Sequence, residues 1–254
     1  MVRRTLAVPG WVALLGVAML LALPLATQAG DADVGVEWCN NFPDRASCDD
    51  LSHRDECAER FYDKLRDNGW IGRFCYGNNN AWERDFKDSD NGGWDQSYID
   101  RCDIALVASH GNSNGVSLNS TVDDQRITNS DAIWGDDNDL EWIILDACGC
   151  LERGARLGWQ PCFDRLHTIC GFDTNAHDKS WRGKKMARKL LNSYTVVQAW
   201  WYASETTEGS GTYSATMGVY APNDTWGDHI HGEGSVASDS DPWTATWYAS
   251  HDCD

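Results

Sequence analysis

The chain has 254 residues, of which 42% are hydrophobic, and a formal net charge of −18. This length is sufficient for one domain with a full hydrophobic core. Such strong acidity argues against nucleic acid or an anionic membrane surface as a partner, because like charges repel.

The first 29 residues have the pattern of a secretory signal peptide. Arg3 and Arg4 form a basic start, residues 11–25 are an apolar run, and residues 27–29 (TQA) fit a cleavage site for signal peptidase. The apolar run is shorter than the roughly 20 residues of a membrane helix, although a retained anchor is the alternative. We therefore predict a secreted protein that makes no membrane contact after cleavage.

Short apolar runs and their spacing predict the elements of the first half of the chain. Residues 34–38 and 70–76 are expected strands, and the helical spacing within residues 47–68 predicts an amphipathic helix between them. A loop rich in Gly, Asn and Asp follows. Continuous apolar runs within residues 98–109 (CDIALVAS) and at residues 142–147 (WIILDA) predict two strands that are buried on both faces.

The remaining segments alternate in the same way. The stretch between the two buried strands is polar and irregular, with room for a small hairpin. After the second buried strand we predict, in order, a short helix (151–157), a strand (166–171), two helices (181–191 and 195–203) and a strand (216–220), and then an irregular tail from residue 222.

Buried strands that alternate with helices predict an α/β fold, with a mainly parallel sheet and helices on both faces. We divide the chain into the signal peptide (1–29), an α/β domain (30–203) and a C-terminal extension (204–254) packed on the same domain. In sheets of this kind the functional site lies at the carboxyl ends of the strands.

A histidine and a cysteine follow the two buried strands. The first strand continues into Ser109-His110-Gly111, and the second ends in Asp146-Ala147-Cys148. If the strands are neighbours, the His110 imidazole can approach the Cys148 thiol, favour the thiolate and donate a proton to a leaving group. The backbone N–H groups of Gly111 and Cys148 are reasonable donors for a developing oxyanion.

An apolar strand that ends in His-Gly, followed by one that ends in Asp-Ala-Cys, resembles the caspase–haemoglobinase group of cysteine peptidases. The chain also resembles an uncharacterised family of secreted caspase-like domains through its GVEW, GNNNAWERDF, ASHGN and LDACGC motifs. The resemblance implies a caspase-like sheet, with His110 as general acid/base, Cys148 as nucleophile and the Gly111 and Cys148 amides as oxyanion hole. It implies a peptide or protein substrate, and neither a cofactor nor a metal ion.

Ten cysteines, all after residue 29, leave a non-catalytic alternative open. Export makes disulfides the default, and an even number fits five bridges. The alternative is then a caspase-like binding domain in which Cys148 and Cys150 are both bridged. If Cys148 is free, Cys150 is the natural second unpaired thiol, and a reversible Cys148–Cys150 bond is a hypothesis for a redox lock. For Asp146 we expect a cap on the following helix.

The segment Asp228-His229-Ile230-His231 offers a second kind of site. Two histidines at positions i and i+2 of an extended segment can share a metal ion, with His251, Asp239 or Glu233 as a third ligand. A metal-dependent enzyme built on the His229/His231 region is therefore the second alternative function.

Overall fold

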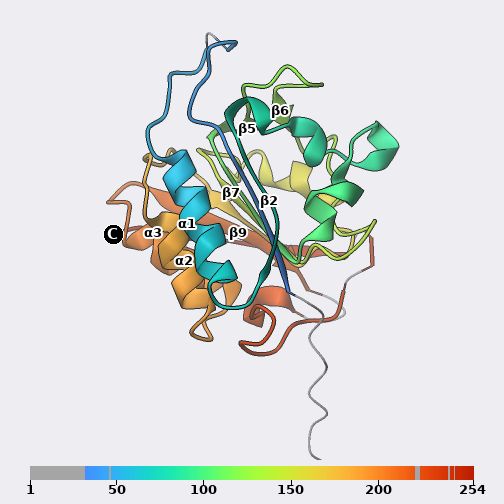
Figure 1. Ribbon diagram of the computed structural model, residues 1–254. Helices are drawn as coiled ribbons and strands as arrows, with labels where there is room; N and C mark the ends of the chain where they lie inside the picture. The colour runs from blue at the N-terminus through green and yellow to red at the C-terminus, as the bar shows by residue number, and fades with distance from the viewer. Residues whose placement is uncertain (1–31, 46, 221–223, 240, 243) are drawn as a thin grey trace, which may run out of the picture.

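A seven-stranded sheet in the order β10-β9-β8-β7-β3-β1-β2 forms the centre of the molecule (Figure 1). The computed structural model describes residues 32–45, 47–220, 224–239, 241–242 and 244–254. The predicted signal peptide lies outside the described residues. Among the residues that are described, no helix has both the length and the apolarity needed to cross a bilayer.

Five strands of the sheet are parallel, and the last two are antiparallel to their neighbours. The parallel strands are β1 (Asp33–Trp38), β2 (Ile71–Gly77), β3 (Ile104–Ala108), β7 (Trp142–Asp146) and β8 (Thr168–Phe172); the antiparallel ones are β9 (Tyr213–Val219) and β10 (Thr246–Asp252). A small second sheet contains β4 (His110–Asn112), β5 (Gly115–Ser117) and β6 (Arg126–Ile127). The predicted α/β class with a mainly parallel sheet is thus confirmed.

The C-terminal extension contributes β9, which corresponds to the strand predicted at residues 216–220, and also β10, which makes it less irregular than predicted. The tail after residue 222 was expected to lack regular structure, yet Thr246–Asp252 pairs with β9 as the edge strand. The sequence of β10 is largely polar because an edge strand needs few buried side chains. Trp247 provides the anchor, since its indole N–H donates to the Val219 carbonyl at 3.1 Å.

All three α-helices cover one face of the sheet (Figure 1). They are α1 (Arg54–Arg66), α2 (Arg182–Leu190) and α3 (Val196–Glu205). Alternate side chains of the strands point to this face, where Leu106 and Ile144 share a core with Phe61 of α1, Met186 of α2 and Trp200 of α3. At the start of α3, Thr195 and Gln198 form a capping box.

The opposite face is covered by short 3₁₀ turns and irregular segments, which differs from the expectation of helices on both faces. The turns are η1 (Asn78–Asn80), η2 (Glu83–Asp85), η3 (Ser89–Asn91), η4 (Asp95–Ser97), η5 (Ile99–Arg101) and η6 (Arg156–Cys162); a further turn, η7 (Thr225–Gly227), precedes β10. The strand residues Val107 and Leu145 share the core of this face with Phe86, Trp134 and Trp159.

The predicted helix over residues 151–157 is wrong, because turns lead from Cys148 into η6. Gly149 adopts a φ of +57°, in the left-handed region that ends helices. Gly154, Gly158 and Pro161 further disfavour an α-helix, since glycine and proline have the poorest helix propensities.

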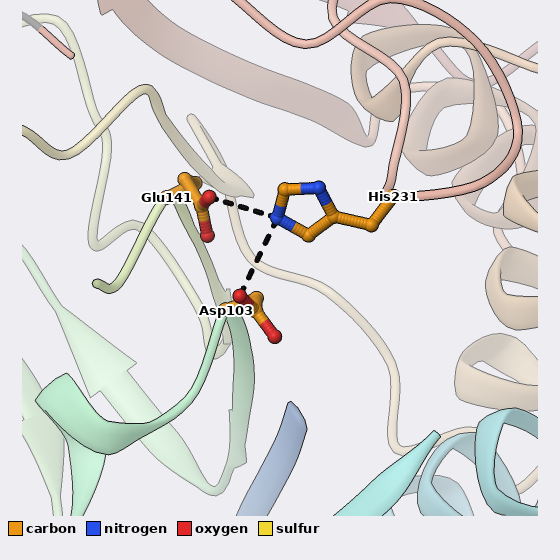
Figure 2. Close-up of side chains that lie close together, drawn as sticks. All are labelled: Asp103, Glu141 and His231. Carbon is orange, nitrogen blue, oxygen red and sulfur yellow. Dashed lines mark hydrogen bonds and ion pairs between the residues drawn. The ribbon is translucent and has the colours of Figure 1, made fainter. Parts of the chain in front are cut away.

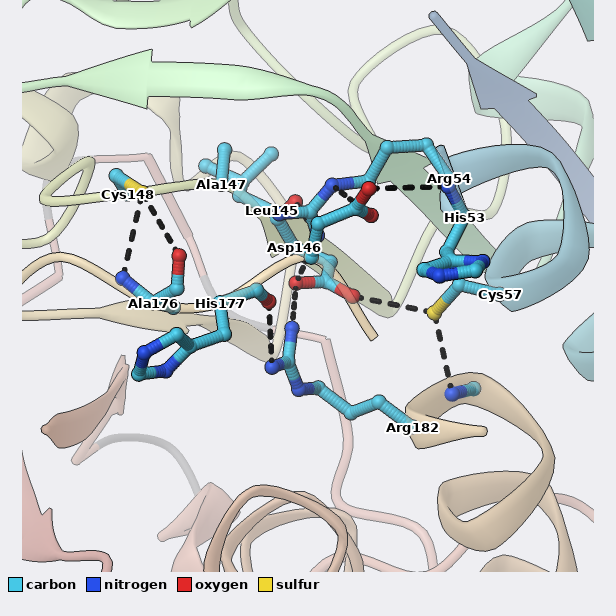
Figure 3. A network of polar contacts seen from close by, with 12 residues as sticks. His53, Arg54, Cys57, Leu145, Asp146, Ala147, Cys148, Ala176, His177 and Arg182 are labelled. Carbon is cyan, nitrogen blue, oxygen red and sulfur yellow. Dashed lines mark hydrogen bonds and ion pairs between the residues drawn. The ribbon is translucent and has the colours of Figure 1, made fainter. Parts of the chain in front are cut away.

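A buried charged network joins the end of β7 to α1 and α2 (Figure 3). Asp146, which is 0% exposed, forms an ion pair with Arg54 at 3.0 Å and a second one with Arg182. Its other carboxylate oxygen accepts a hydrogen bond from the Cys57 thiol at 3.1 Å. Burial acts to raise the pKa of Asp146, but the Arg182 and Arg54 guanidiniums outweigh it and hold the pKa below its ordinary value. The expected role of Asp146 as a helix cap is therefore wrong.

We predict that Asp146→Asn lowers the free energy of unfolding by about 3–5 kcal/mol, because it leaves two buried guanidiniums without their shared carboxylate. Chemical denaturation measures this change. Glu56→Gln is the matched control, since Glu56 pairs with Arg60 on the exposed surface of α1 at 2.9 Å, where such a pair contributes less than about 1 kcal/mol. Equal losses in the two variants would contradict the anchoring role of Asp146.

Candidate functional site

The neighbouring strands β3 and β7 bring His110 and Cys148 to the same edge of the sheet. The strands are parallel and adjacent, with Ala108 opposite Asp146 in the register. His110 and Cys148 each lie two residues beyond this pair. The juxtaposition of the two strand ends therefore follows the sequence-based expectation.

The His110 imidazole is oriented by a main-chain oxygen. Its Nε2 lies 2.7 Å from the carbonyl oxygen of Asp49, in the loop between β1 and α1, and its ring lies 5.0 Å from that of Phe42 between centroids. A carbonyl oxygen can only accept a hydrogen bond, so Nε2 carries the proton and Nδ1 of the neutral ring remains an acceptor. Sequence reasoning missed Asp49, and no side-chain pattern signals this contact because any residue supplies a carbonyl oxygen.

The Cys148 thiol is half-buried and contacts the loop after β8 (Figure 3). Its Sγ accepts a hydrogen bond from the Ala176 N–H at 3.3 Å and donates to the Ala176 carbonyl at 3.3 Å. Among the described residues, Cys148 and His110 form no hydrogen bond with each other, and catalytic hydrogen bonds often tighten only when substrate is bound.

Gly111 permits the close approach of β4 to the turn at Cys148. A Cβ atom at this position would lie 2.7 Å from the Ala147 Cβ and 2.8 Å from the Cys148 carbonyl oxygen. The Cys148 backbone N–H donates no hydrogen bond to any residue in the described part of the chain. This N–H is thus available to an oxygen atom placed next to the thiol, as an oxyanion hole requires.

Cys150 has different surroundings from Cys148. It is 0% exposed, and its thiol contacts the main-chain oxygens of Leu145 at 3.5 Å and Ala147 at 3.3 Å. Burial raises the pKa of Cys150 to about 12, which makes it a poor nucleophile at neutral pH. All ten cysteines are free thiols in the structure, so the bridges expected for an exported chain stay a prediction.

The opposite edge of the sheet carries a second polar group, which contains His231 (Figure 2). Its Nε2 lies 2.9 Å from Glu141 and 3.4 Å from Asp103. Asp103 and Glu141 directly precede the adjacent parallel strands β3 and β7, so the amino ends of these strands bring them together. Sequence reasoning missed both carboxylates, although their equivalent positions before two buried strands were a usable signal.

This group is an ion cluster in which the imidazole carries a proton. Hydrogen bonds to Asp103 and Glu141 raise the pKa of His231 to about 10. His229 belongs to none of the groups of three or more possible metal ligands among the described residues, and Asp239 lies instead 3.5 Å from His167. The structure therefore does not join His229 and His231 in one metal site.

The fold and the two strand ends define an α/β protein in which a histidine and a free cysteine follow adjacent strands at the carboxyl edge of a mainly parallel sheet. The family model described as a domain of unknown function (DUF6345) matches residues 36–251, which include both residues, and the chain belongs to this family. No curated protein matches the chain.

We predict that His231→Gln lowers the free energy of unfolding by about 1.5–3 kcal/mol near pH 6, because it removes a charged hydrogen bond from two carboxylates. A pKa that folding raises contributes stability in full below the ordinary histidine pKa and loses it as the pH rises through about 10. Denaturation curves over this pH range, compared with wild type, measure the difference. The control is His53→Gln at an exposed position. A His231 effect that does not shrink at alkaline pH would contradict the ion cluster.

Proposed function

We propose that the protein is a cysteine endopeptidase in which Cys148 is the nucleophile and His110 the general acid/base. The observation that carries the proposal is the register of β3 and β7, which sets both residues two positions beyond the paired strand ends. The Asp49 carbonyl supports the assignment, since it leaves Nδ1 of His110 as the atom that accepts a proton.

The reaction follows from these groups. His110 Nδ1 takes the Cys148 proton, and the sulfur attacks the carbonyl carbon of a peptide bond to form a tetrahedral intermediate. The Cys148 and Gly111 N–H groups stabilise its oxyanion. The imidazolium then protonates the leaving amine, and a water molecule, deprotonated by the imidazole, hydrolyses the thioester. For this cycle the thiol must turn from Ala176 towards His110 by rotation of the Cys148 side chain.

The order of the two motifs supports a peptidase of the caspase-like kind rather than another thiol enzyme. Residues 109–111 follow β3, and residues 146–148 lie at the end of the adjacent strand β7, which matches the order of these motifs in caspase-like peptidases that the sequence resembles. The resemblance does not extend to residues that read the substrate side chain, so the proposed substrate class is peptides or proteins in general. Secretion, with cleavage after residue 29, completes the proposal.

We predict that Cys148→Ala abolishes cleavage of a peptide library and that His110→Ala lowers kcat/KM by at least about 100-fold, because each removes one half of the proton-transfer pair. Cys75→Ala is the control, since Cys75 is half-buried on the edge strand β2. This variant should retain wild-type cleavage.

Alkylation separates the peptidase from the binding-domain alternative. Iodoacetamide should label Cys148 of the native protein, with or without mild reductant, and mass spectrometry locates the label. A Cys148 that never reacts, together with cleavage that is unaffected by Cys148→Ala, overturns the proposal. A bridge from Cys148 to a distant cysteine in every molecule favours the binding domain.

A further inference from the structure

Four aspartates gather on the face of the sheet that carries no α-helix. Asp88 caps η3, Asp95 begins η4, Asp100 lies in η5, and Asp136 lies in the loop before β7. The ligand oxygens of Asp88, Asp95 and Asp136 all lie within 4.8 Å of one another. Asp100 faces the same group, since Asp95 and Asp136 are the charges that act most strongly on its carboxylate.

Three of these four carboxylates are buried, Asp136 is half-buried, and no basic side chain of the described residues compensates them. Asp95 and Asp100 are 0% exposed and Asp88 is 2% exposed. One buried oxygen of each of Asp95, Asp100 and Asp136 has no hydrogen-bond partner. Over the part of the chain that the structure describes, none of the four forms an ion pair with a basic side chain.

Without a cation this arrangement is electrostatically unfavourable. Carboxylates held close together away from solvent repel one another, and burial penalises their charged form. Buried charges in proteins are paired or coordinate metals. The unpartnered oxygens therefore point to a bound cation that replaces the missing counter-charge.

We propose that Asp88, Asp95 and Asp136 bind a Ca²⁺ ion, with Asp100 beside them as a further ligand or as a hydrogen-bond acceptor that supports the site. Two oxygens on one Ca²⁺ ion are separated by at most about 4.6–5.2 Å, twice the Ca–O distance. The ligand oxygens of the three aspartates all lie within 4.8 Å of one another, close enough to share one ion. The remaining positions of the coordination shell are then filled by water.

The donor set distinguishes Ca²⁺ from other metals. All candidate ligands are carboxylate oxygens, which suit hard cations and not Zn²⁺ or Cu²⁺. Mg²⁺ is usually held by one or two carboxylates and keeps several waters, whereas Ca²⁺ accepts more carboxylates on an irregular backbone. Three turns and a loop supply the ligands here.

Two other acidic groups in the molecule do not meet the same criteria. Glu83, Asp124 and Asp131 surround Lys87, whose ammonium lies 3.9 Å from Glu83 and 3.8 Å from Asp124. Asp103 and Glu141 are paired with His231. Each of these groups already contains its own cation. The Asp88–Asp95–Asp136 group, which we name the aspartate site, has none among the described residues.

The backbone around the aspartate site is held in place by the chain itself. The Asp88 N–H donates to the Asp131 carbonyl at 2.9 Å, and the Asp88 carbonyl accepts from Gly93 at 2.9 Å. The Asp100 carboxylate accepts from the Gly135 N–H at 3.0 Å. A Ca²⁺ ion at this point would join η3 and η4 to the loop before β7, and so stabilise the face that has no helix.

Titration of the chelator-treated full chain with Ca²⁺ tests the site by two readouts. Calorimetry should give one ion per chain with a Kd of about 10⁻⁵–10⁻³ M, and Tm should rise with Ca²⁺ concentration, as for any ligand of the native state. Tb³⁺, a luminescent substitute for Ca²⁺, should be sensitised on excitation of tryptophan, since Trp94 directly precedes Asp95.

Asp95→Asn should weaken Ca²⁺ binding by at least about tenfold, because it removes a charged ligand. In the presence of chelator the same variant should be at least as stable as wild type, because it also removes carboxylate repulsion. If Asp95 had a purely structural role, Asp95→Asn would lower Tm both in the presence of Ca²⁺ and in the presence of chelator. Asp124→Asn, at an exposed residue beside Lys87, is the matched control and should leave Ca²⁺ affinity unchanged.

Three results overturn the assignment: no Ca²⁺ binding by the wild type, equal or stronger stabilisation by Mg²⁺, or equal affinity in Asp95→Asn and wild type. None of these readouts uses peptidase activity, so the site stands or falls independently of the Cys148–His110 proposal.

Discussion

The buried pairing of Asp146 with Arg54 and Arg182 is the interaction on which the candidate site depends. It ties the last residue of β7 to α1 and α2, and the chain turns immediately afterwards into Ala147 and Cys148. Arg54 also donates to the Asp146 carbonyl oxygen at 3.2 Å. Both the side chain and the main chain are therefore held just before the proposed nucleophile, which gives the thiol a rigid base.

The two edges of the sheet use the same topology for different purposes. Half-buried His110 and Cys148 each lie two residues beyond the paired carboxyl ends of β3 and β7. At the amino ends, Asp103 and Glu141 meet His231, which comes from the C-terminal part of the chain. Adjacent parallel strands bring equivalent positions together at both edges, so a polar residue just outside one strand meets its counterpart outside the next.

The uneven covering of the sheet connects the fold with the aspartate site. Three α-helices cover one face and satisfy their own backbone groups, whereas the other face is covered by irregular segments and 3₁₀ turns, most of them between β2 and β3. Short turns leave polar side chains such as Asp95 and Asp100 beside the core. A bound cation would balance the negative charge of these carboxylates and would hold together turns that contain little regular structure.

Periodicity in the sequence was enough to predict the α/β class, the buried strands β3 and β7, and the strand-end positions of His110 and Cys148. These features follow from local patterns, because a continuous apolar run has few alternatives to a buried strand. Only the tertiary structure decided what Asp146, Asp49 and His231 contact, which strand the tail adds, and where the four aspartates meet. Their partners lie far away in the chain, and a backbone carbonyl or an unpaired carboxylate has no signature in the sequence around it.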